Sequence, residues 1–96
     1  MNSCYILFSK KLSRFYIGIC HDDLSSRIIK HNDHSYGSHR YTAKADDWVL
    51  ILNIKCDSLI QSLKIEKHIK SMKSSVYIKN LSLFPDIVKK LKEKYS

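Results

Sequence analysis

The sequence predicts a single small α+β domain, in which a three-stranded antiparallel sheet is flanked by helices in the order ββ-α-β-α-α. Two short β-prone runs joined by a polar loop open the chain, and a third apolar run lies near its middle. Apolar residues at helical spacing follow these runs. At 96 residues the chain can build one hydrophobic core, so we expect one domain over residues 1–96.

The first two runs predict a β-hairpin, with residues 4–8 and 15–20 as its strands and a polar loop between them. Successive side chains of a strand point to opposite faces of the sheet. One face should therefore supply a core-facing surface made of Ile6, Phe8, Phe15, Ile17 and Ile19. The opposite face should carry Tyr5, Tyr16 and Gly18.

The first helix is predicted over residues 24–32. Asp22 or Asp23 can cap it, because a carboxylate accepts hydrogen bonds from the free amides of a first helical turn. Arg27 and His31 are four residues apart, so they should share one face of this helix.

A polar, aperiodic segment at residues 34–47 follows the helix, with Gly37 as the expected turn. We expect a surface loop there, and its length indicates a functional role. Residues 48–54 are large and branched apolar residues, which predict a third strand that is central or well buried.

A second helix is predicted over residues 57–73. Leu59 and Leu63 mark its apolar stripe, and on a helical wheel Glu66 and Lys70 fall close to that stripe. The carboxylate of Glu66 should therefore face inward or lie along the border, where an acid is seldom placed without a partner.

Residues 74–80 are predicted to connect this helix to a terminal one within residues 81–95, where Pro85 suits the first turn. The apolar face of the terminal helix is formed by Phe84, Ile87, Val88 and Leu91. Its outer face is basic and carries Lys89, Lys90, Lys92 and Lys94.

The formal net charge of +8, with a pI near 9.5, indicates a polyanionic partner, because clustered Lys and Arg displace the counterions of phosphates. Nucleic acid is the first candidate. The alternative is that the charge serves solubility alone.

The three cysteines, Cys4, Cys20 and Cys56, are odd in number and contain no Cys-x-x-Cys pair. They therefore predict neither a disulfide framework nor a zinc knuckle, and we expect them to be small buried residues. No apolar run approaches the roughly 18 residues that span a bilayer, and no leader is recognised, so the expected location is the cytoplasm.

Six residues resemble, in order and spacing, the motif residues of the GIY-YIG nuclease superfamily. They are Tyr5, Tyr16, Arg27, His31, Glu66 and Asn80, with Tyr16 opening the tripeptide Tyr16-Ile17-Gly18. Each piece alone is common by chance, but the joint order, spacing and element types are specific. The resemblance covers nearly the whole chain. It is nearest to small stand-alone bacterial members, which are similar to the nuclease domain of the excision-repair protein UvrC and to the catalytic domains of homing endonucleases.

Secondary segments strengthen the resemblance, namely Arg40-Tyr41-Thr42, Trp48 and the helical run from Glu66 to Lys70. The first motif departs from the family, because Ser3-Cys4-Tyr5 stands where the family reads Gly-Ile-Tyr. The tyrosine hydroxyl can react, whereas the glycine and isoleucine carry no reacting group, so the change should alter packing more than chemistry.

The resemblance implies a metal-dependent endonuclease acting on nucleic acid, with DNA favoured over RNA. Low intrinsic sequence specificity is expected, because related nucleases owe their targeting largely to appended domains. In this interpretation Glu66 holds a single Mg²⁺ or Mn²⁺ ion and Arg27 binds the scissile phosphate. Tyr16 is the first candidate for the general base, and a His31-assisted Tyr5 is the alternative, which the sequence leaves open.

The same resemblance makes Asn80 a further catalytic candidate. Substrate contacts are expected from Gly18, Thr42, Lys44 and Lys70. Neither the oligomeric state nor the preferred form of the nucleic acid can be read from the sequence.

Three other interpretations compete with a nuclease. The chain can be a nucleic-acid-binding module of the same fold that does not cut, or a protein-interaction adaptor that uses the basic terminal helix. A zinc site built from His31, His34 and His39 is a further alternative, although it has neither cysteines nor a helical histidine spacing. Taken one by one, the candidate residues can also be ordinary packing and surface ion pairs.

Overall fold

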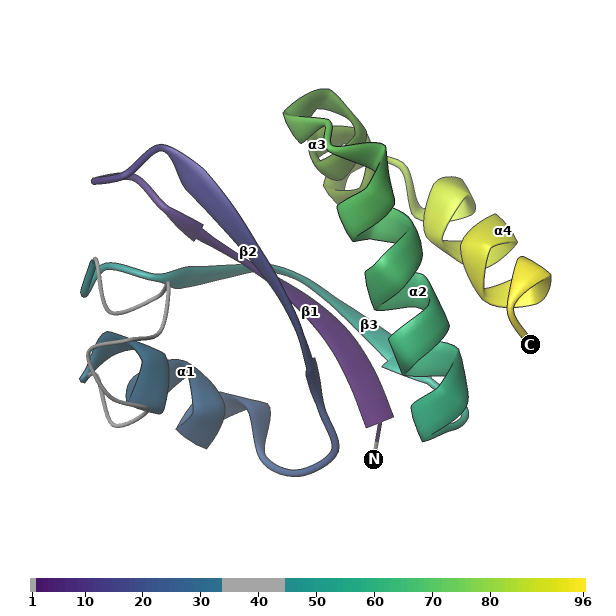
Figure 1. Ribbon diagram of the computed structural model, residues 1–96, viewed down its shortest axis with the longest axis horizontal. Helices are drawn as coiled ribbons and strands as arrows, with labels where there is room; N and C mark the ends of the chain where they lie inside the picture. The colour runs from purple at the N-terminus through teal and green to yellow at the C-terminus, as the bar shows by residue number, and fades with distance from the viewer. Residues whose placement is uncertain (1, 34–44) are drawn as a thin grey trace.

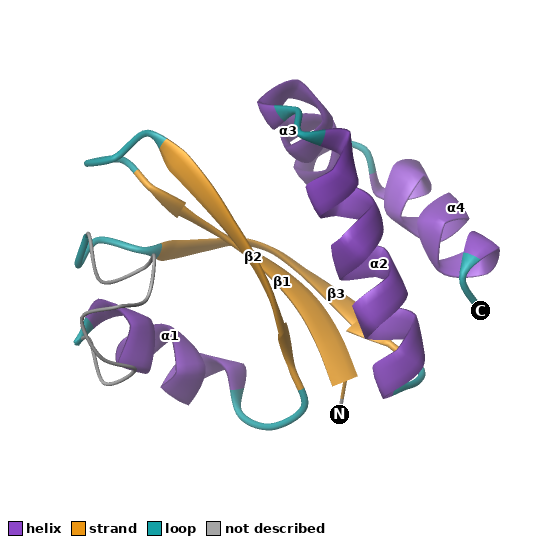
Figure 2. Cartoon of the chain, in the orientation of Figure 1, coloured by secondary structure: helices purple, strands orange, loops and turns teal. Residues whose placement is uncertain are grey.

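The chain folds around a three-stranded sheet in a computed structural model that describes residues 2–33 and 45–96 (Figure 1). The elements are β1 (Asn2–Ser9), β2 (Arg14–Cys20), α1 (Leu24–Asn32), β3 (Val49–Cys56), α2 (Leu59–Met72), α3 (Ser75–Leu83) and α4 (Pro85–Lys94). Helix α1 lies on one side of the sheet and α2, α3 and α4 lie on the other (Figure 2). The predicted α+β class and antiparallel three-stranded sheet are confirmed.

β1 is the central strand, because the order of the sheet is β2-β1-β3 and both pairings are antiparallel. The register of the hairpin pairs Tyr5 with Gly18 and Leu7 with Tyr16. Cross-strand partners share a face of the sheet, so the predicted grouping of Tyr5, Tyr16 and Gly18 on one face is confirmed.

The prediction that the third strand is central or well buried is wrong. β3 is an edge strand, and Val49, Leu50 and Ile51 at its start are exposed. Branched and apolar residues favour a strand wherever it lies, whereas its place in the sheet depends on which strand pairs with which. The composition of this run therefore predicted the strand and could not predict its position.

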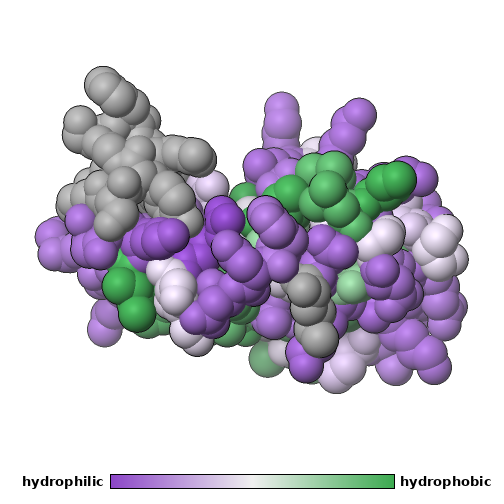
Figure 3. Space-filling model, turned by 90° about the horizontal axis from the view of Figure 1, so that it is seen from below, coloured by the Kyte–Doolittle hydropathy of each residue, from purple (hydrophilic) through white to green (hydrophobic). Residues whose placement is uncertain are grey.

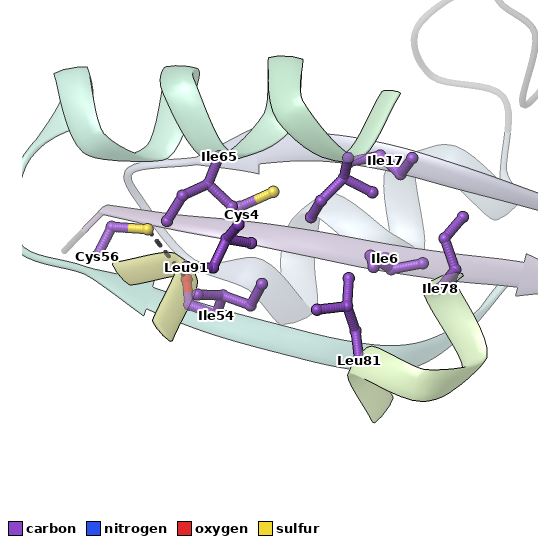
Figure 4. Packing of buried hydrophobic residues seen from close by; sticks show 10 residues of the cluster. Cys4, Ile6, Ile17, Ile54, Cys56, Ile65, Ile78, Leu81 and Leu91 are labelled. Atoms are coloured by element: carbon purple, nitrogen blue, oxygen red, sulfur yellow. Dashed lines mark hydrogen bonds between the residues drawn. The ribbon is translucent and has the colours of Figure 1, made fainter. Parts of the chain in front are cut away.

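Each face of the sheet has its own buried cluster. The cluster under α2, α3 and α4 is formed by Cys4, Ile6, Ile17, Ile54, Cys56, Ile65, Ile69, Ile78, Leu81 and Leu91 (Figure 4). The cluster on the α1 side is formed by Tyr5, Leu7, Cys20, Ala45 and Trp48. Alternate residues of β1 thus contribute to two different cores, and the face with the tyrosines is buried as well.

Helix α2 buries a mixed polar and apolar stripe between the sheet and α4, formed by Gln61, Ser62, Ile65 and Ile69. The prediction that Leu59 and Leu63 mark the core stripe is wrong, because both are exposed. Gln61 and Ser62 can be buried because they are hydrogen-bonded. The Gln61 amide donates to the Lys92 carbonyl at 3.1 Å, and the Ser62 hydroxyl donates to the Leu59 carbonyl at 2.7 Å. Apolar surface is visible over the start of α2, where Leu59 and Leu63 lie (Figure 3).

Residues 75–83 form a helix, α3, where the sequence predicted only a connection. Lys73, with a φ of 49°, ends α2, and the Ser74 hydroxyl caps α3 by accepting a hydrogen bond from the Tyr77 amide at 3.1 Å. The helix buries Ile78 and Leu81 against the sheet. A helix this short is stabilised more by packing than by helix propensity. Its residues favour a strand, so the helix could not be predicted from the sequence.

The terminal helix α4 begins at Pro85, as predicted, and buries Leu91. Within the two described segments of the chain, every helix is too short or too polar to span a lipid bilayer.

Candidate active site

Two phenols and an imidazole meet on the α1 face of the sheet. Tyr5 and His31 share a hydrogen bond of 2.9 Å between Oη and Nε2, in which the donor depends on the imidazole tautomer. The ring of Tyr16 lies 5.0 Å from that of His31 and 6.4 Å from that of Tyr5, measured between centroids. Tyr5 and His31 are 1% and 2% exposed, whereas Tyr16 is only partly buried. Tyr16 is therefore the most exposed of these three side chains.

Gly18 lies beneath these rings. A Cβ atom at position 18 would lie 2.6 Å from Oη and 2.7 Å from Cζ of Tyr5, and 3.1 Å from Cε2 of Tyr16. Side-chain carbons do not approach other heavy atoms that closely, so position 18 must be glycine for Tyr5 to lie where it does.

Arg27 projects from the same helix as His31 and is about one-quarter exposed. Its Nη2 atom lies 3.8 Å from the Asp22 carboxylate just before the helix. A hydrogen bond from the Cys20 thiol, and after it the Arg27 charge, lower the pKa of Asp22. Arg27 lines a hollow of about 230 Å³ together with Asp22, Asp23 and Lys30, so two carboxylates and two cations face this hollow.

Helix α1 starts at the predicted residue because Asp23 caps it, with its carboxylate accepting hydrogen bonds from the Ser25 amide at 3.2 Å and the Ser26 hydroxyl at 2.7 Å. Asp22, the other predicted cap, pairs with Arg27 instead. Asp23 thus caps the helix, and Asp22 pairs with the arginine of the same helix.

Glu66 and Lys70 lie on α2, on the opposite face of the sheet. Their side chains form an i,i+4 ion pair at 3.5 Å, with Glu66 20% exposed. Burial and then the Glu66 charge raise the pKa of the Cys4 thiol to about 12, so the carboxylate lies close to Cys4. Cys4 and Tyr5 are successive residues of β1 and point to opposite faces. The acid and the tyrosine pair are therefore separated by the sheet.

The structure thus brings Tyr5, Tyr16, Gly18 and His31 together and places Arg27 on the same helix as His31. Asn80 lies half-buried on α3, on the side of the sheet that carries α2. Thr42 and Lys44 lie outside the described residues, as do Arg40 and Tyr41 of the predicted loop motif.

The donor atoms present fit a metal held by one carboxylate. No three His, Cys, Asp or Glu side chains of the described residues cluster closely enough to enclose an ion. Mg²⁺ is often held by one or two carboxylates, with waters and substrate phosphates completing its oxygen shell, and Glu66 can serve in that way. Of the histidines considered for zinc, His31 bonds to Tyr5, and His34 and His39 lie outside the described residues.

Asn32 and Asp47 position the site, although the sequence did not single them out. Asn32 Oδ1 accepts from the Trp48 amide at 2.7 Å, and its Nδ2 donates to the Trp48 carbonyl at 3.0 Å. This clamp fixes the end of α1, next to His31, to the start of β3. Trp48 in turn packs edge-on against Tyr16, with the ring centroids 6.3 Å apart.

Asp47 holds the β1–β2 turn. It accepts a hydrogen bond from the Ser9 hydroxyl at 2.6 Å and from the Lys11 amide at 2.9 Å, and these bonds lower its pKa. The only sequence signal for either residue was its position beside a motif residue, Asn32 after His31 and Asp47 before Trp48.

Comparison with known proteins identifies the family. The family model described as the GIY-YIG catalytic domain matches residues 1–80. No curated protein and no solved structure matches the chain. The matched region contains all the elements from β1 to α2 and most of α3, and with them the six motif residues. The chain therefore belongs to the GIY-YIG family of catalytic domains, which implies phosphodiester hydrolysis of the nuclease type and a nucleic-acid substrate.

Proposed function

We propose that this protein is a metal-dependent endonuclease that cuts DNA in preference to RNA, with low sequence specificity of its own. The observation that carries the proposal is the hydrogen-bonded pair of Tyr5 and His31 packed beside Tyr16. Phenol and imidazole groups in contact can pass a proton between them, and hydrolysis begins by taking a proton from water.

Tyr16 is the proposed general base. Tyr5 and His31 are almost fully buried, whereas Tyr16 is partly exposed, so an attacking water reaches Tyr16 more easily. The Tyr5–His31 pair then supports one side of the Tyr16 ring and completes the hydrogen-bonding network. This difference in exposure favours Tyr16 over a His31-assisted Tyr5.

Arg27 is proposed to bind the scissile phosphate. Its planar guanidinium donates two parallel hydrogen bonds to phosphate oxygens and keeps its charge at any working pH. The carboxylate of Asp22, which is largely exposed, lies 3.8 Å from Nη2 of Arg27, and a phosphate would compete with it for the guanidinium. The arginine would thereby stabilise the negative charge that develops on the phosphate oxygens.

Glu66 is proposed to hold Mg²⁺ or Mn²⁺, which when bound supplies positive charge to the phosphate and to the leaving oxygen. Lys70, 3.5 Å away, balances the carboxylate and can also contact a substrate phosphate. Asn80 is a further proposed catalytic residue, and Gly18, Thr42 and Lys44 are proposed substrate contacts. Because α1 and α2 lie on opposite faces, we infer that the substrate strand passes the open edge of β2, where the two faces meet.

The test is a cleavage assay with end-labelled single-stranded, duplex and branched DNA and with RNA, in Mg²⁺, Mn²⁺ or EDTA. Arg27→Ala and Glu66→Gln should abolish cleavage while thermal melting and circular dichroism stay native. The exposed Lys89→Gln on α4 serves as the matched control and should cut like the wild type.

Each result that contradicts the proposal would favour a different interpretation. If every substrate stays intact in both metals, while binding remains strong and salt-dependent, the chain is a non-cleaving nucleic-acid-binding module. If Glu66→Gln cuts as well as the wild type, the proposed role of that carboxylate is wrong. A protein-interaction adaptor would show neither cleavage nor binding.

A further inference from the structure

A second hollow lies on the α2 face of the sheet, between the first half of β2 and the turn from α2 into α3. Its volume is about 350 Å³, which falls within the range of small-molecule and nucleotide pockets. Arg14, Lys70 and Lys73 contribute positive charge to its lining. None of the catalytic roles proposed above uses Arg14 or Lys73.

The charge of this hollow is unbalanced. Its described lining residues include no aspartate or glutamate. Lys70 pairs with Glu66, but within the described segments neither Arg14 nor Lys73 forms an ion pair. Both side chains are exposed and can turn into the hollow. Cations gathered around one cavity repel each other until an anion is shared between them, so the hollow is suited to a phosphate.

The other wall of the hollow is apolar. Phe15, Ile17, Ile69 and Ile78 line it. The ring of Phe15 packs against that of Phe8, with the centroids 4.9 Å apart, so this wall includes a packed aromatic side chain. Bases stack on such surfaces in proteins that bind single strands, and this stacking does not depend on the base sequence.

We propose that the hollow binds one unpaired nucleotide of the substrate strand, with its phosphate on Arg14, Lys70 and Lys73 and its base against Phe15. A nucleotide in a duplex is stacked and paired, and it would have to leave the helix to enter. The proposal rests on the proposed function and gives it a substrate class: single-stranded or branched nucleic acid. Lys70 also pairs with Glu66, so the bound nucleotide would lie beside the carboxylate proposed to hold the metal.

The experiment measures binding by fluorescence anisotropy in EDTA, where no cleavage occurs. The probes are a labelled single-stranded DNA, the same strand as RNA, and a blunt duplex of equal length. The variants are Arg14→Gln, Lys73→Asn and Phe15→Leu, and the matched control is the pair Lys89→Gln and Lys90→Gln on the outer face of α4. Asparagine tolerates the positive φ of position 73, so Lys73→Asn should fold normally.

We expect Arg14→Gln and Lys73→Asn each to weaken single-strand binding about 5-fold to 10-fold at low salt. Each should also reduce the slope of log K against log salt by roughly 0.7, the value for one lost phosphate contact on a single strand. Phe15→Leu should weaken single-strand binding without changing that slope. Duplex binding should change less than twofold in all three variants. The α4 control should change neither single-strand binding nor duplex binding.

Equal losses on duplex and single strand, or equal losses in the α4 control, would overturn the proposal, as would a wild type that binds no single strand. Because the assay contains no metal, it gives an answer even if the protein never cuts. Conversely, a protein that cuts but binds single strands independently of Arg14, Lys73 and Phe15 would remain a nuclease without this pocket function.

Discussion

Gly18 faces Tyr5 across the β1–β2 ladder, and the phenol of Tyr5 fills the space in which a side chain at position 18 would begin. The same Tyr5 hydroxyl shares a hydrogen bond with Nε2 of His31. The third residue of the Tyr16-Ile17-Gly18 motif must thus be glycine because the ring of Tyr5 lies against it. This contact links the two halves of the family motif.

Gly18→Ala should displace the Tyr5 ring, because its new Cβ would lie 2.6 Å from the tyrosine oxygen. The ring cannot move without lengthening the bond to His31, so we expect a loss of about 1–3 kcal/mol of stability and a large loss of cleavage. Chemical denaturation and the cleavage assay measure the two effects. Because the new Cβ would also lie 2.7 Å from Cζ of Tyr5, the double variant Gly18→Ala with Tyr5→Phe should remain less stable than Tyr5→Phe alone. Equal stability of these two variants would show that only the hydroxyl clashes.

Tyr16→Phe and Tyr5→Phe separate the two candidates for the general base. If Tyr16 takes the proton from water, its variant should lose about 10²-fold to 10⁴-fold in rate, whereas Tyr5→Phe should lose less and cost about 1 kcal/mol of stability. Single-turnover cleavage rates and denaturation curves provide both numbers. A greater rate loss in Tyr5→Phe would exchange the two roles.

Asn32→Ala should loosen the end of α1 from the start of β3. It removes two hydrogen bonds to the Trp48 backbone, of 2.7 Å and 3.0 Å, and leaves backbone groups without those partners. We expect a destabilisation of about 2–4 kcal/mol. The exposed Lys30→Ala, on the same helix, is the control and should change stability by less than about 0.5 kcal/mol. Equal effects of the two substitutions in urea denaturation would refute the clamp.

His68 should make stability depend on pH. Its Nε2 bonds to the Tyr77 hydroxyl at 3.1 Å and its Nδ1 to the Tyr95 hydroxyl at 3.0 Å, which joins α2 to α3 and to the residue that ends α4. Burial and then the Lys94 charge lower its pKa from 6.5, so the folded protein binds this proton less well than the unfolded chain. The stability contributed by neutral His68 is therefore present above pH 6.5 and lost as the pH falls toward the folded pKa.

The measurement is the melting temperature from pH 8 to pH 5 for the wild type and for His68→Gln, which keeps polar atoms but does not titrate. The other histidines are common to both proteins, so their contribution cancels in the difference. The wild type should lose more stability than the variant on acidification. Parallel curves would show that His68 does not contribute to the pH dependence.

The three cysteines should resist alkylation in the folded protein. Cys4, Cys20 and Cys56 are free and buried, and burial raises the pKa of each thiol, that of Cys4 to about 12. Only the thiolate reacts at a useful rate, so iodoacetamide at pH 8 should modify the native protein slowly and the denatured protein quickly. Mass spectrometry of timed samples counts the adducts. Rapid modification of Cys4 before unfolding would contradict its burial on the α2 face.

The local elements could be predicted where the sequence carried a strong local pattern. Helix α1 spans Leu24–Asn32 as expected, because Asp23 at its start is a strong capping residue and the chain turns polar after Asn32. The hairpin and its two faces were predictable because side chains alternate along a strand. In α3, by contrast, the residues favour a strand, and packing of Ile78 and Leu81 on the sheet, together with the Ser74 cap, makes them helical.

The sequence by itself determined the family, the antiparallel hairpin and the residue types of the candidate site, because these depend on the order and spacing of residues along the chain. Only the tertiary structure decided that β3 lies at an edge, that Gln61 and Ser62 replace Leu59 and Leu63 in the core, and that Glu66 lies across the sheet from Tyr5 and His31. Each of these depends on contacts between residues far apart in the chain, which local patterns of hydrophobicity do not encode.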